Sequence, residues 1–195
     1  MKKLSPLRKV HLLLMIVLLF CSGFSTVVFF GGFEFAVAGK DKLEVILTGC
    51  TTLTVMVMLL TGVLYLVRGY KKNAAVYYKA FILLMVLVTL IDLITNMVCN
   101  TMNVLLIIRC ALFAIKIIFL LLLAFGKDLG QKKAWIILYV IIGLDIAGMI
   151  VLLIIMSGTG FDFSLIGAIA ALVADVTLGL AIHGKYDDKA SRGTH

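Results

Sequence analysis

Six polar or ionisable side chains interrupt apolar segments of this chain, and their types and spacing could support binding chemistry. Carboxylates beside basic side chains can hold an ion or a charged solute, and acidic residues inside membrane proteins often form proton relays. The candidate substrate- or ion-binding residues are Asp92, Asn96, Arg109, Lys116, Asp145 and Asp175.

Arg109 and Lys116 lie in one apolar stretch, residues 103–125, that is long enough to cross a bilayer. A charge near the centre of such a helix costs roughly 2.5–3.5 kcal/mol on insertion scales. The two cations are seven residues apart, which places them on one face of a helix. They therefore need partners from other segments of the chain.

Counting residues from each predicted turn indicates which partners lie at the same depth, because a helix rises by a constant amount per residue. The count pairs Asp92 with Arg109, and it groups Lys116 with Asp145 and Asp175. Three carboxylates against two cations leave one negative charge over, which favours a proton shared between Asp145 and Asp175. The alternative is that these charges only hold helices together and fix their register.

The composition shows what must position these residues. The chain is 63% hydrophobic and only 14% charged, which a soluble domain of 195 residues could not accommodate. We expect an all-α fold, a polytopic transmembrane bundle of six helices forming a single membrane domain over residues 1–195. The predicted spans are approximately residues 11–30, 43–67, 80–99, 103–125, 134–156 and 163–182.

The positive charges predict the orientation. Of the eighteen Lys and Arg residues, only Lys40 and Lys42 fall in the loops opposite the N-terminus, and only Arg109 and Lys116 fall inside spans. Cytoplasmic loops are rich in such cations, so we expect a multi-pass protein of the cell membrane with both termini in the cytoplasm. The same rule accounts for the net charge of +8 without a nucleic-acid partner.

The first segment has two interpretations. A basic start, an apolar run and the small residues Ala36-Val37-Ala38 resemble a cleaved signal peptide. The apolar run of residues 11–30 is, however, longer than the 7–15 residues usual in a signal. We therefore expect a retained first helix.

A faint internal repeat suggests how the helices are arranged. Residues 79–92 and 133–145 each begin with Lys-Ala-aromatic and end on an aspartate. The repeat predicts three helical hairpins in parallel orientation. The alternative is that Lys-Ala-aromatic is simply common where a membrane helix leaves the cytoplasm.

Polar and small residues recur on two of these segments. Thr89, Asp92, Asn96, Cys99 and Asn103 form a stripe that predicts a vestibule leading to the buried charges. Near the C-terminus, the small residues around Asp175 would let a neighbouring helix approach closely. They are Ala168, Ala171 and Gly179.

Other side chains favour structural interpretations. We expect the threonines of residues 48–61 to bond to their own helix backbone. The aromatics Tyr65, Tyr78 and Phe81, with others at the same borders, predict an interfacial belt. The polar tail after residue 182 is expected to be disordered.

Motifs of catalysis and metal binding are absent from the sequence. It has no GxSxG, no HExxH, no glycine-rich phosphate loop and no CxxC. We therefore expect no enzyme activity, no cofactor and no metal site.

The size, the six spans and the cytoplasmic termini resemble those of the substrate-binding subunits of energy-coupling-factor vitamin transporters. The resemblance is one of architecture, because the chain carries no motif of that family. We expect a small-solute or ion-coupled transporter, or a transport-complex subunit. The alternative is an accessory or scaffold protein that binds another membrane protein. Expected partners are the lipid bilayer and either another protein or a second copy of the chain.

Overall fold

A computed structural model describes residues 6–69, 74–101, 103–126, 129–157 and 164–192. The described residues form helices joined by short turns and contain no strand. Its elements are α1 (Pro6–Phe30), α2 (Glu34–Val37), α3 (Lys42–Leu64), a π-helical turn (Tyr65–Gly69), α4 (Ala74–Cys99), α5 (Val104–Phe125), α6 (Gln131–Met156) and α7 (Ser164–Arg192).

Six of these helices are long and apolar enough to cross a membrane. They coincide with the six predicted spans to within a few residues, so the predicted all-α, six-helix class is confirmed. This is a multi-pass membrane protein. Its helices form because the bilayer offers no water to backbone groups, which must then bond within each segment.

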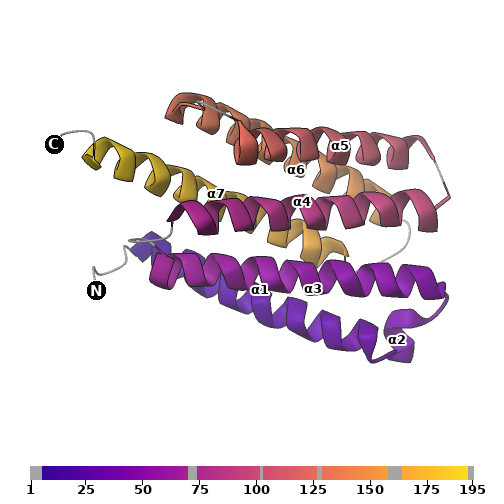
Figure 1. The fold of residues 1–195 in the computed structure, drawn as a ribbon. Helices are drawn as coiled ribbons and strands as arrows, with labels where there is room; N and C mark the ends of the chain where they lie inside the picture. The colour runs from indigo at the N-terminus through magenta and orange to yellow at the C-terminus, as the bar shows by residue number, and fades with distance from the viewer. Residues whose placement is uncertain (1–5, 70–73, 102, 127–128, 158–163, 193–195) are drawn as a thin grey trace.

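The long helices alternate in direction and form three hairpins (Figure 1). Helices α1, α4 and α6 run one way and α3, α5 and α7 run back, so the three hairpins are parallel to one another. The first residue of α1 and the last of α7 lie at the same end of the bundle, and α2 lies at the opposite end. We call these the terminal end and the α2 end.

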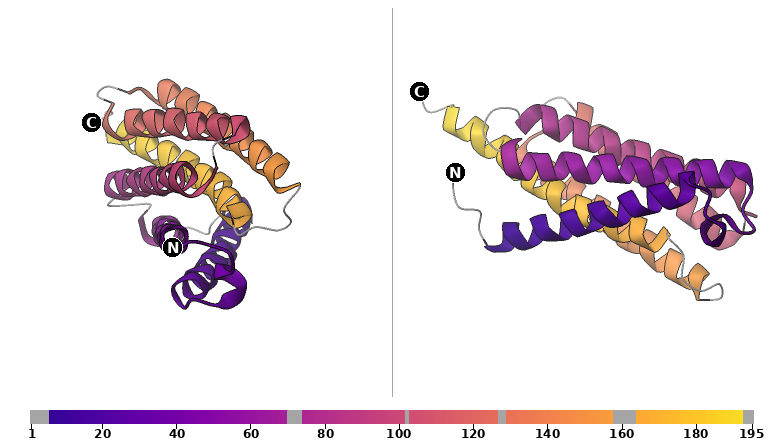
Figure 2. Two further views of the ribbon diagram at one scale, coloured as in Figure 1. Left: turned by 90° about the vertical axis from the view of Figure 1, so that its right-hand side faces the viewer. Right: turned by 90° about the horizontal axis from the view of Figure 1, so that it is seen from below.

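The long helices pack in chain order, and α7 contacts most of the others. Each long helix packs against the next in the chain, and α7 packs against α1 as well as α6. Helix α7 also contacts α3 and α4, and the end-on view shows it crossing the middle of the bundle (Figure 2). Helix α5 lies between α4 and α6, so the cations of α5 face two helices that each carry an aspartate.

The aromatic residues near the terminal end correct one expectation. Tyr65, Tyr78 and Phe81 are at most 3% exposed and belong to the core, so they are not part of an interfacial belt. The hydroxyl of Tyr78 donates to the carbonyl of Leu123, and that of Tyr65 to the carbonyl of Leu180. Leu123 lies in the last turn of α5, where carbonyls lack intrahelical partners, so the tyrosine satisfies an otherwise unbonded group.

The C-terminal tail corrects a second expectation from the sequence. We expected disorder after residue 182, but α7 continues to Arg192. The stretch contains no proline, and the lysine, alanine and arginine in it are good helix formers. The polarity of this segment indicates that it lies outside the membrane, and a polar segment outside the membrane can still be helical.

Candidate functional site

A cavity of about 230 Å³ lies inside the bundle and is lined by residues of all six spanning helices. It extends from the α2 end, where it contacts Lys40, Glu44 and Asn100, to the middle of the spans. Its other polar and charged lining residues are Ser22, Ser25, Thr48, Thr51, Thr52, Thr89, Asp92, Thr95, Asn96, Arg109, Lys116 and Asp145. Five of the six residues predicted to form a site therefore face one space.

The deepest charged contact of the cavity is an ion pair between α5 and α6. The ammonium of Lys116 donates to both carboxylate oxygens of Asp145, at 2.6 and 2.7 Å. Lys116 lies twelve residues beyond the start of α5, about 18 Å along the helix, which is the middle of the span. The depth count predicts this contact. The prediction is correct because the helical rise fixes how far each of the two side chains lies from the turn that joins α5 to α6.

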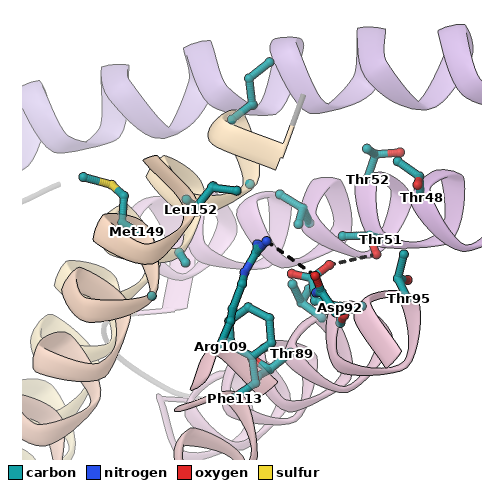
Figure 3. A pocket seen from close by; sticks show the side chains of 18 of the residues that line it. Thr48, Thr51, Thr52, Thr89, Asp92, Thr95, Arg109, Phe113, Met149 and Leu152 are labelled. Atoms are coloured by element: carbon teal, nitrogen blue, oxygen red, sulfur yellow. Dashed lines mark hydrogen bonds between the residues drawn. The ribbon is translucent and has the colours of Figure 1, made fainter. Parts of the chain in front are cut away.

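A second polar group lies nearer the α2 end (Figure 3). Arg109 lies with its guanidinium over the ring of Phe113, 5.2 Å from the centroid, and donates to Asn96 Oδ1 at 3.5 Å. Asn96 donates in turn to the main-chain carbonyl of Asp92 at 2.6 Å. The carboxylate of Asp92 accepts from the hydroxyl of Thr51 at 3.2 Å. Asn96 thus links Arg109 to the backbone of Asp92, and a direct Asp92–Arg109 ion pair stays a prediction.

Asp175 lies behind the cavity and does not line it. It is 1% exposed, and neither carboxylate oxygen accepts a hydrogen bond from a described donor. Its neutral form is placed to hydrogen-bond with Asp145. It is close enough to Asp145 and Lys116 to interact electrostatically with both. An ionised carboxylate in such surroundings would be costly, so the neutral form is favoured.

The threonines of α3 fall into two groups, of which the sequence predicts only one. Thr52, Thr54 and Thr61 do donate to carbonyls of their own helix, as expected. Thr51 instead donates to Asp92, and it lines the cavity with Thr48 and Thr52. The signal that could have shown this is the helical spacing of the three hydroxyls, which places them on one face.

Small and polar residues of other helices complete the lining. The predicted stripe on α4 does face the cavity through Thr89, Asp92 and Asn96, and Thr95 joins them. Asn103 lies outside it and caps α5, accepting from the amide of Leu106 at 2.8 Å. On α7, Ala168 and Ala171 line the cavity. Ser22 and Ser25 of α1 were not predicted, because single serines in an apolar run carry no clear signal.

The α2 end of the cavity is bordered by an ion pair between Lys40 and Glu44, four residues apart. Gly39, just before it, has φ +73°, a conformation that favours glycine and turns the chain into α3. The cavity therefore has one charged pair at each end.

Within the described ranges, no group of three or more His, Cys, Asp or Glu side chains could hold a metal ion. Comparison of the chain with protein-family models, with curated proteins and with solved structures finds no match.

Proposed function

We propose that this membrane protein binds a small solute in the cavity between its six helices, as a small-solute or ion-coupled transporter or as the membrane subunit of a transport complex. The observation that supports this is the cavity itself. Charges that served only to hold helices together would need contact and not space, and protein interiors normally fill such space because voids are destabilising. Here the charged residues surround about 230 Å³ of it.

The group formed by Lys116, Asp145 and Asp175 suits ion coupling. Lys116 balances one carboxylate, and Asp175 lies beside the pair, close enough to Asp145 to share a proton with it. Loss or gain of one proton at the two aspartates would change the net charge directly behind the bound solute. We therefore propose these three residues as the coupling group and Asp92, Asn96 and Arg109 as solute contacts.

We propose binding and not catalysis in the cavity, because its described lining contains neither histidine nor cysteine. The distribution of lysine and arginine supports cytoplasmic termini, which would place the α2 end of the cavity on the outer side of the cell membrane.

Native mass spectrometry of the full chain, extracted gently from its own membrane, tests the proposal. We expect a retained small molecule that is lost in Asp145→Asn. Lys132→Gln, an exposed substitution at the start of α6, is the matched control and should keep the molecule. A wild-type protein without any small molecule, and without a proton or ion flux in vesicles, would contradict the proposal.

The alternative function is an accessory or scaffold role. It is favoured by the Lys116–Asp145 pair, which joins α5 to α6 and would serve helix packing equally well. That role predicts a stoichiometric protein partner or a homo-oligomer with no small molecule. It also predicts that Asp145→Asn combined with Asp175→Asn leaves the partner bound.

A further inference from the structure

The charges of the cavity cancel, which limits what it can bind. Its lining holds three cations, Lys40, Arg109 and Lys116, and three anions, Glu44, Asp92 and Asp145. Two cation–anion pairs, one at each end, are in direct contact. A solute with a net charge would leave that charge unbalanced in a site surrounded by lipid, so a solute without net charge is favoured.

Much of the hydroxyl lining of the cavity can accept but not donate further hydrogen bonds. Four lining hydroxyls donate their single proton to a carbonyl of their own helix, at 2.8–2.9 Å, so their oxygens can only accept further bonds. These hydroxyls, from α1, α3 and α4, belong to Ser25, Thr52, Thr89 and Thr95. Asp92 lines the same cavity, and its carboxylate also accepts only. Such acceptors suit an ammonium group.

Arg109 supplies hydrogen-bond donors to the same cavity. Arg109, from α5, carries five N–H groups and no acceptor, and its planar group matches a carboxylate. Phe113 supports the guanidinium from one side at 5.2 Å and limits its positions. In Figure 3, Arg109 and Asp92 extend from neighbouring helices toward the same space. The donor Arg109 and the acceptor Asp92 therefore lie close together, at the polar group that Asn96 links.

We infer that the solute is a small zwitterion of amino-acid size, with its ammonium against Asp92 and the lining hydroxyls and its carboxylate against Arg109. This inference rests on the proposed function of the cavity. The volume of about 230 Å³ lies below the roughly 300–1,000 Å³ of clefts that take drug-sized ligands, so a small solute is expected.

The probes are the twenty common amino acids, measured on the purified full chain by thermal unfolding and by calorimetry. For the tightest-binding amino acid, three comparison probes follow: its amide, which is only cationic, its deaminated acid, which is only anionic, and glucose, which is uncharged. We expect the zwitterion to bind at least about tenfold more tightly than each comparison probe, since hydrogen bonds to charged groups are the strong ones.

Two variants assign the ends of the ligand. Asp92→Asn should abolish the preference for the zwitterion over the deaminated acid and keep the preference over the amide. Arg109→Gln should abolish the preference for the zwitterion over the amide and keep the preference over the deaminated acid. Because each variant retains one preference, a general loss of folding cannot produce this result. The control variant Lys132→Gln should keep both preferences.

Equal binding of glucose or of a singly charged probe would overturn the inference, as would the absence of binding by every amino acid. If native mass spectrometry still shows another solute that is lost in Asp145→Asn, only the zwitterion inference fails and the proposed function stands. If no solute is found by either method, both fail.

Discussion

Lys116 on α5 contacts both carboxylate oxygens of Asp145 on α6, and the two side chains are only 6% and 7% exposed. The pair lies in the middle of two spans, where either charge alone would be costly. It joins two neighbouring helices and also forms the deep end of the cavity. One contact therefore has a structural and a functional interpretation, which can be separated by experiment.

Breaking the pair from one side should destabilise the protein. Asp145→Leu or Lys116→Met leaves one buried charge without its partner, and we expect a loss of about 3–5 kcal/mol in the free energy of unfolding. The double variant removes both charges and should regain most of that stability. Thermal and denaturant unfolding in detergent would measure this, and single variants as stable as wild type would contradict it.

The same double variant tests whether the pair has a function besides packing. We expect it to fold and to lose the small molecule that wild-type protein retains in native mass spectrometry. A folded double variant that still retains that molecule would assign Lys116 and Asp145 to packing alone.

Asp175 should respond differently from Asp145 to the same chemical change. Its carboxylate oxygens accept no hydrogen bond from a described donor, and its neutral form, which an amide resembles, is favoured and is placed to hydrogen-bond with Asp145. We expect Asp175→Asn to change the free energy of unfolding by less than about 1 kcal/mol. Asp145→Asn leaves the buried charge of Lys116 without its partner, so it should lower the free energy of unfolding several times more. Infrared spectroscopy gives an independent measurement: a band from a protonated carboxyl should be present in wild type and absent in Asp175→Asn. A band that persists in this variant would contradict the assignment.

Filling the cavity should block binding without unfolding the bundle. Ala168 of α7 lines the space, so Ala168→Leu places three more carbons where there is room. We expect loss of the retained solute and little change in stability, because overpacking costs about 1–3 kcal/mol only where a core is already full. Ala114→Leu, on the exposed face of α5, is the matched control and should affect neither. Unchanged solute retention in Ala168→Leu would show that the solute binds elsewhere.

The spans and the Lys116–Asp145 contact could be predicted because each depends on one simple constraint. The bilayer sets the length of an apolar helix, and the constant helical rise sets the depth of a charge along it. Neither requires knowledge of which helix faces meet.

The remaining details depend on those faces. Thr51 and Thr54 of α3 have the same side chain and similar neighbours in the sequence, yet one donates to Asp92 and the other to its own helix. The difference arises because α4 packs beside α3, which the sequence of α3 alone does not specify. Tyr78 likewise has the sequence context of an interfacial residue, and it is buried because it lies against the end of α5.

The orientation of the bundle decides which side of the membrane the cavity faces. A variant with its four cysteines replaced by alanine would carry a single new cysteine, either Lys42→Cys at the start of α3 or Lys132→Cys at the start of α6. These positions lie at opposite ends of the bundle, the first at the α2 end. Because lysine and arginine concentrate on the side of the termini, we expect a membrane-impermeant maleimide to label Lys42→Cys in intact cells. Lys132→Cys should be labelled only after permeabilisation. The reverse pattern would turn the α2 end of the cavity toward the cytoplasm, and the same charged lining would then contact solute from inside the cell.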